Sequence, residues 1–279
     1  MALLTPLAGE NLDLGRTAAA LKHTASGGKT ALVLSAGGMY GAYQAGVWKT
    51  LSERFQPDLI VGASVGSLNG WLIAGGVSGG DLVHRWLSLD LASELRWRLP
   101  RSLSDGFLDG ELLEQWAREM CRDYSPRIEY GLVATEVPSL RPKLFRGAEI
   151  TWRHLAASCA VPLVLRHHRI DGVYYTDGGL VDPCPLWAAV EMGADRIVAV
   201  NVLKTRPLAI QAMAAAARAR GLCRPSHFPG VEIIDISPSG SLGSPRDAMY
   251  WTRANAERWV ELGMTNASEK MRAPRNIWL

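Results

Sequence analysis

Ser64 is the residue whose setting most clearly indicates chemistry. It is the centre of residues 62–66, which match the Gly-x-Ser-x-Gly pattern of a nucleophile elbow. A strand-like apolar run at 58–63 leads into it, and a helix-compatible run at 68–74 follows it. In such a sharp turn the serine hydroxyl is exposed, and the two glycines remove side chains that would collide. The pattern and its context predict that Ser64 is a nucleophile.

A second match to the same pattern, at 76–80, has a different context. It follows a helix-like segment rather than a strand and lies in a Gly-rich turn. Its serine, Ser78, is therefore expected to be a loop residue. Short motifs arise by chance, so the flanking elements have to decide between the two matches.

A nucleophilic serine needs a base, and two residues are candidates. Of the six histidines, only His227 lies late enough to follow an acid in the Ser–acid–His order of the α/β-hydrolases. The alternative is Asp177, which ends a short strand and enters a Gly-Gly turn. A carboxylate in a partly dry cleft can take the serine proton without an imidazole. Both also have plain structural interpretations, since His227 lies in a proline-bounded loop and Asp-Gly is a common turn pair.

A glycine-rich turn at 35–41 is suited to an anion. It follows an apolar run at 30–34 and precedes a helix expected at 42–55. Backbone N–H groups at such a turn lie at the positive end of a helix, which favours a phosphate or a transient oxyanion. A dinucleotide site is not indicated because G-x-G-x-x-G is absent, and no Gly-Lys-Ser/Thr occurs for a P-loop. Packing in a tight turn is the other explanation for these glycines.

Strands and helices alternate along the chain. Strands are expected at 30–34, 58–63, 130–137, 173–176, 196–202 and 231–236, and helices at 42–55, 68–74, 152–158, 185–192, 207–220 and 245–271. This rhythm predicts an α/β fold, a three-layer α/β/α sandwich with a central, mostly parallel sheet. No internal repeat or linker divides the chain. We expect one domain over 1–279, with a peripheral arm at 1–28 and a closing helix at 245–271.

The composition of the 279-residue chain narrows the function classes. A net charge of +3 is too small to indicate nucleic-acid binding, and no such motif occurs. The four cysteines are far apart, so neither a zinc site nor a disulfide framework is expected. No apolar window is long enough for a transmembrane helix, and the first seven residues do not resemble a signal peptide. These features predict a cytoplasmic protein; the sequence does not indicate its oligomeric state.

Taken in order, the glycine-rich turn, the Gly-x-Ser-x-Gly motif and Asp-Gly-Gly at 177–179 resemble the signature of the patatin-like phospholipases. The stretches at 157–162, 181–186 and 193–200 also look like segments of that family. The resemblance runs from residue 31 to about residue 236, which is most of the chain.

The resemblance implies a Ser–Asp dyad with Ser64 as the nucleophile and Asp177 as its base. The N–H groups of Gly37 and Gly38 would hold the oxyanion. The implied reaction is hydrolysis of fatty-acyl esters of phospholipids or lysophospholipids through an acyl-enzyme, with no metal or cofactor. The partner would be a lipid substrate, reached by peripheral contact with a membrane.

The chain departs from the family in the glycine-rich turn. Alanine stands at position 36 where the family has a glycine, and Met39-Tyr40 replaces a basic residue. Loss of that cation leaves ester hydrolysis in place but brings the preference for phospholipids into question. Acyl transfer with the same dyad, and a catalytically silent lipid-binding protein of the same fold, are the alternatives.

Residues 82–116 are rich in tryptophan, leucine and arginine. Such an amphipathic stretch fits a membrane interface or a cover over the site. A helical layer packed on the sheet, with its arginines in water, shows the same pattern.

Overall fold

The architecture is described from a computed structural model, which covers residues 28–89, 110–203 and 211–272 except 213, 214, 216, 218, 223 and 226. The expected arm at 1–28 therefore lies outside the described residues apart from Gly28, as do 90–109 of the Trp/Arg-rich stretch. Within the described ranges, no helix is both long enough and apolar enough to cross a bilayer.

Five parallel strands form the centre of the sheet, in the order β3, β2, β1, β7, β8. Their bounds are Glu129–Val137, Leu59–Ala63, Lys29–Leu34, Ala194–Val200 and Glu232–Ile236, respectively. All of β2, and all of β1 after Lys29, is buried. Continuous apolar strands of this kind belong in a parallel sheet that is covered on both faces.

An antiparallel extension lies beyond β3. β4 (Pro142–Arg146) pairs with residues 131–135 of β3, and β6 (Val173–Thr176) pairs with residues 135–137. β5 (His168–Ile170) then pairs with β6. Because β6 joins the carboxyl end of β3, the residue after it, Asp177, is delivered to the same edge of the sheet as the end of β2.

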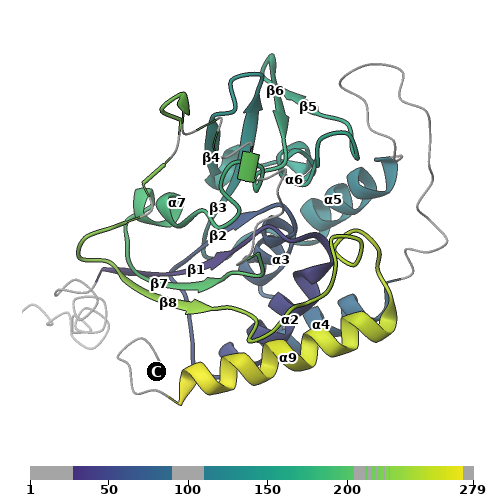
Figure 1. Ribbon diagram of the computed structural model, residues 1–279, viewed down its shortest axis with the longest axis vertical. Helices are drawn as coiled ribbons and strands as arrows, with labels where there is room; N and C mark the ends of the chain where they lie inside the picture. The colour runs from purple at the N-terminus through teal and green to yellow at the C-terminus, as the bar shows by residue number, and fades with distance from the viewer. Residues whose placement is uncertain are drawn as a thin grey trace, which may run out of the picture.

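Helices cover both faces of the sheet, as Figure 1 shows. On one face lie α2 (Gly41–Leu51), α3 (Val65–Ala74), α4 (Gly79–Leu87) and the long α9 (Arg253–Met271). α5 (Glu111–Asp123) and α6 (Trp152–Ser158) contribute to the same core. α7 (Leu186–Glu191) packs on the other face. The predicted three-layer α/β/α sandwich with a mostly parallel sheet is confirmed.

Several expected bounds need correction. The closing helix begins at Arg253, not at 245, because Thr252 accepts the Asn255 N–H as its N-cap and residues 244–250 form hydrogen-bonded turns. The first helix ends at Leu51, earlier than the expected residue 55. β4 and β5 were not predicted, since each is short and only partly buried and so has no clear apolar pattern.

Two other expected segments fall partly outside the described residues. Of the helix expected at 207–220, the described residues 211, 212, 215, 217 and 219 are helical. The Trp/Arg-rich stretch at 82–116 is helical at its described ends, which belong to α4 and α5.

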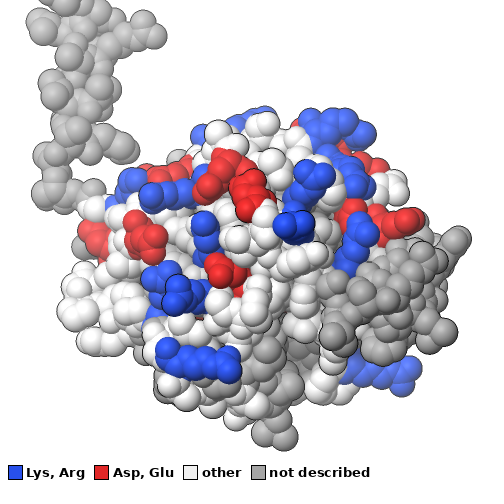
Figure 2. Space-filling model, turned by 90° about the horizontal axis from the view of Figure 1, so that it is seen from above, with Lys and Arg blue, Asp and Glu red and all other residues white. Residues whose placement is uncertain are grey.

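The surface charge is mixed on the face seen from above. In Figure 2, basic and acidic side chains are interspersed over the described part of this face. This distribution matches the small net charge of the chain.

Candidate active site

Ser64 stands on a strained turn between β2 and α3. Its backbone has φ 53° and ψ −130°, a conformation that non-glycine residues rarely adopt. A Cβ on Gly62 would lie 2.2 Å from the Gly66 carbonyl oxygen, and one on Gly66 would lie 2.3 Å from the Leu34 carbonyl oxygen. The elbow therefore packs closely against itself and against β1, which only glycines at these two positions permit.

Hydrogen bonds to the backbone of Ser64 hold the elbow in place. Its N–H donates to Ser158 Oγ over 3.0 Å, and Ser158 Oγ donates to the Val133 carbonyl over 2.7 Å. On the other side, Ser67 Oγ donates to the Ser64 carbonyl over 2.6 Å. These bonds fix the backbone of Ser64, a residue that is only 6% exposed.

Asp177 lies beside Ser64, at the end of β6. Its Oδ1 accepts the Gly179 N–H over 2.7 Å, and its carbonyl accepts the Thr135 hydroxyl over 2.8 Å. Its Oδ2 is buried and has no hydrogen-bond partner within the described part of the chain. The orientation of the carboxylate is thus fixed through one oxygen, while the other is left for a proton.

Burial raises the pKa of Asp177 to about 6, although the adjacent Ser64 hydroxyl and the Gly179 N–H each lower it. The Ser64 hydroxyl thus stabilises the carboxylate as a nearby donor does, but the two make no hydrogen bond of ordinary geometry. Ser64 and Asp177 are thus a close pair without a formed hydrogen bond. Such contacts are often long in unliganded sites. At neutral pH the carboxylate is ionised and poorly solvated, so it can act as a base.

The glycine-rich turn lies against the Asp177 turn. The Ala36 N–H donates to the Pro183 carbonyl over 2.8 Å. A Cβ on Gly179 would lie 2.2 Å from the Cβ of Ala36, so the two backbones come this close because Gly179 has no side chain. Ala36, the first departure from the family pattern, fits here without displacing either turn.

The N–H groups of Gly37 and Gly38 donate to no acceptor among the described residues. Gly38 lines the same cavity as Ser64. Unpaired backbone N–H groups of this kind are able to hold an oxyanion.

Ser64 opens into an apolar cavity of about 650 Å³. Its walls come from α3, α4, α5 and the loops at 161–165 and 248–249, and include Leu68, Leu72, Trp86, Leu113, Trp116 and Leu165. The described ends of the Trp/Arg-rich stretch thus form part of the wall. A cavity of this size and lining suits an extended hydrocarbon group.

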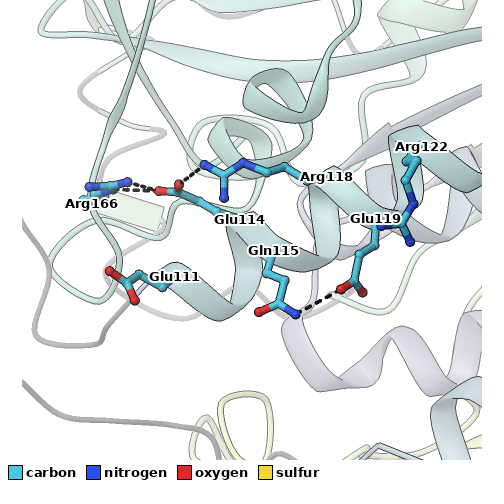
Figure 3. A pocket seen from close by; sticks show the side chains of 7 residues that line it. All are labelled: Glu111, Glu114, Gln115, Arg118, Glu119, Arg122 and Arg166. Carbon is cyan, nitrogen blue, oxygen red and sulfur yellow. Dashed lines mark hydrogen bonds and ion pairs between the residues drawn. The ribbon is translucent and has the colours of Figure 1, made fainter.

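A second, polar pocket of about 750 Å³ lies on the side of α5 shown in Figure 3. The buried Glu114 carboxylate accepts hydrogen bonds from Arg118 over 3.0 Å and from Arg166 Nε over 2.8 Å. This network ties α5 to Arg166, the residue that directly follows the loop at 161–165, so it links two walls of the apolar cavity.

The other sequence candidates lie apart from this pair. His227 is exposed, and the neighbouring Phe228 packs in the core on the α7 face. No contact joins His227 to Ser64 or Asp177 among the described interactions. Ser78 is the N-cap of α4, where its Oγ accepts the Asp81 N–H over 3.1 Å, so it has a structural role rather than that of a plain loop serine.

Two residues of the site had no role assigned from sequence. Ser158 links the Ser64 N–H to β3, and its own carbonyl accepts the Gly178 N–H over 2.9 Å. The Cys159 thiol lies next to Ser64 and Ser67, and burial, followed by the Asp177 charge, raises its pKa. The family-like stretch at 157–162 contains both and was the signal available for finding them.

Comparisons with known proteins identify the family of the chain. A family model described as patatin-like phospholipase matches residues 32–190. An uncharacterized NTE family protein of Mycobacterium bovis is 29% identical over 178 residues, covering 62% of this chain and 49% of that protein. Lysophospholipase nte1 of Aspergillus oryzae is 29% identical over 194 residues, covering 63% of this chain and 12% of that protein. The chain spans about half or less of the length of these relatives.

A solved structure shares the fold. The crystal structure of VipD from Legionella pneumophila superposes with a TM-score of 0.55 at 13% sequence identity, covering 88% of this chain and 67% of that one. At this identity the likeness concerns the fold alone.

Proposed function

Because the chain belongs to the patatin-like phospholipase family, we propose that it is a lipid acyl hydrolase that cleaves fatty-acyl esters of phospholipids or lysophospholipids with Ser64 and Asp177. One observation carries the proposal. A serine on a strained elbow lies beside a buried carboxylate with one unpaired oxygen, and the serine opens into an apolar cavity.

In the proposed mechanism, Ser64 Oγ attacks the ester carbonyl carbon while its proton passes to the carboxylate of Asp177. The carbonyl oxygen becomes an oxyanion, held by the Gly37 and Gly38 N–H groups. The tetrahedral intermediate collapses, the alcohol leaves with the proton from Asp177, and the acyl group stays on Ser64. Asp177 then takes a proton from water, which attacks the acyl-enzyme. The bond between the acyl carbon and Ser64 Oγ breaks, the fatty acid leaves, and Asp177 returns the proton to Ser64 Oγ.

The cavity supports a lipid as the substrate. Its lining consists mainly of apolar side chains. Burial of hydrocarbon against such side chains stabilises the complex by about 25 cal/mol for each Å² of apolar surface removed from water. The acyl chain would lie in this cavity with its ester carbonyl at Ser64, and the headgroup would remain outside. The lysophospholipase name of the Aspergillus relative is consistent with this class of substrate.

A fluorophosphonate probe with mass spectrometry of the modified peptide tests the proposal. We expect labelling of Ser64 in the wild type, none at that position in Ser64→Ala, and a sharp decrease in Asp177→Asn. Ser78→Ala removes the serine of the second motif match and serves as the matched control. It should label like the wild type, as should His227→Ala, which removes the triad alternative.

Two results would contradict this function. Absence of labelling in folded wild type would favour a silent lipid-binding protein, and loss of labelling in His227→Ala would favour a triad. If Ser64 is labelled, release of fatty acid from phospholipid and lysophospholipid substrates then identifies the ester that is cleaved.

A further inference from the structure

We propose that Tyr40 and the loop at 242–251, here called the clamp loop, position the oxyanion turn, so that a segment beyond the family-matched residues completes the active site. The inference rests on the proposed function. It makes Tyr40 a positioning residue, which acts on the reaction through the backbone of Gly37 and Gly38.

Tyr40 connects the oxyanion turn to the clamp loop. Its hydroxyl donates to the Ser244 carbonyl over 2.8 Å. Its ring, which is 6% exposed, packs edge-on against Trp259 of α9 with 5.0 Å between ring centroids. The side chain therefore ends in the protein and not in the cavity. Tyr40 is thus an internal anchor of the oxyanion turn.

The clamp loop also contacts the turn directly. The Met39 N–H donates to the Ala248 carbonyl over 2.9 Å. Gly38, at φ 55°, lies so close to that carbonyl that a Cβ on it would be 2.1 Å from the oxygen. Because the clamp loop accepts the Met39 N–H, the orientation of the peptide between Gly38 and Met39 is set. The two peptides before it carry the Gly37 and Gly38 N–H groups, which have no acceptor within the described part of the chain.

α9 in turn holds the clamp loop in one conformation. Asp247 accepts hydrogen bonds from the Ser244 N–H and hydroxyl, each over 2.7 Å, and from Asn255 Nδ2 over 3.2 Å. The Trp259 indole N–H donates to the Leu242 carbonyl over 2.7 Å. A continuous set of contacts thus runs from α9 through Asp247 and Ser244 to Tyr40.

The far end of the clamp loop reaches the cavity wall. The Trp251 indole N–H donates to the Trp86 carbonyl over 3.0 Å, and Trp86, Ala248 and Met249 all line the cavity. The same loop therefore supports the oxyanion turn and part of the acyl site. The family model ends at residue 190, well before this loop.

The test compares Tyr40→Phe with Tyr43→Phe. Both remove the hydroxyl of a buried tyrosine. The Tyr43 hydroxyl donates to Asn266 Oδ1 of α9 over 3.1 Å, and within the described residues it makes no hydrogen bond to the oxyanion turn. With a soluble short-chain ester we expect Tyr40→Phe to lower kcat about 10-fold, a fraction of the loss caused by removing an oxyanion donor. KM should stay within about twofold, since ground-state binding is untouched. Tyr43→Phe should change neither constant.

A pair of inhibitors separates positioning from general damage. An alkyl trifluoromethyl ketone forms a tetrahedral oxyanion adduct with Ser64, whereas an unreactive ether of the same chain length only fills the cavity. Tyr40→Phe should weaken binding of the ketone by the same factor by which it lowers kcat. Binding of the ether should not change. Asp247→Asn should give a smaller change in the same direction, and it carries the test if Tyr40→Phe does not fold.

Equal effects of Tyr40→Phe and Tyr43→Phe, or equal weakening of ketone and ether, would overturn the inference while leaving the hydrolase intact. A wild type that neither hydrolyses the ester nor is labelled at Ser64 would overturn the proposed function, and this inference with it.

Discussion

At the scale of single residues, the burial that raises the pKa of Asp177 also lowers the stability of the fold at neutral pH. Its Oδ2 is buried without a partner, and burial raises its pKa from 3.8 to about 6. Because the folded-state pKa is above the unfolded-state value, the native state holds this proton more tightly. The resulting stabilisation is fully present below pH 3.8 and is lost as pH rises through about 6. The ionised Asp177 carboxylate, which the proposed mechanism needs as a base near neutral pH, thus destabilises the fold there.

Asp177→Asn should therefore become more stabilising, relative to the wild type, as pH rises. Between pH 4.5 and 7.5 we expect the wild type to lose about 2 kcal/mol of unfolding free energy relative to Asp177→Asn, which lacks this titration. Each unit of pKa shift corresponds to about 1.4 kcal/mol. Denaturant unfolding at the two pH values measures this difference. A difference between the two proteins that does not vary with pH would show that Asp177 has an ordinary pKa.

At the scale of elements, Ser158 joins three parts of the site. It ends α6, and its hydroxyl bridges the Ser64 N–H to the Val133 carbonyl of β3. Its carbonyl holds the Asp177 turn through the Gly178 N–H. The relative placement of Ser64 and Asp177 thus depends on a residue that belongs to neither motif.

Ser158→Ala should leave a buried N–H and a buried carbonyl unpaired, at a loss of about 1–3 kcal/mol in the free energy of unfolding. Fluorophosphonate labelling of Ser64 should slow as the elbow loosens. Ser237→Ala is the control, because it also removes a serine hydroxyl bond, to Asp235, but outside the site. Wild-type stability and labelling in Ser158→Ala would show that the bridge is dispensable.

The sequence was most informative where function depends on local pattern. The elbow at Ser64 and the turn at Asp177 are short, contiguous signals, and the bounds expected for α6 and β6 agree with the structure. Ser158 could not be assigned, because its partners are 94 and 25 positions away. The start predicted for α9 is too early, because residues 244–250 form turns around Asp247. Hydrophobic periodicity does not distinguish such turns from the first turns of a helix.

At the scale of the whole molecule, the proposed function requires the cavity to take lipid from a surface, and Leu163 lies in the loop that forms one wall of the cavity. This leucine is 71% exposed, so its apolar side chain is in contact with water. Its φ of 68° is also a backbone conformation that residues other than glycine rarely adopt. Its neighbours Val161, Val164 and Leu165 line the cavity. An apolar side chain at this position would gain by entering the lipid surface from which the substrate comes.

Leu163→Asn should separate activity at a lipid surface from activity in solution. Asparagine accepts a positive φ more readily than leucine, so we expect stability to stay equal or rise by up to about 1 kcal/mol. Hydrolysis of phospholipid held in vesicles should fall about 10-fold, since burying a leucine contributes roughly 1.5–3 kcal/mol. Hydrolysis of a soluble short-chain ester should not change. The matched control is Leu140→Asn, at a leucine that also has a positive φ, 60°, but lies in the β3–β4 turn and is not among the cavity-lining residues. Equal losses on vesicles and on the soluble ester, or the same loss in Leu140→Asn, would show that Leu163 does not contact the lipid surface.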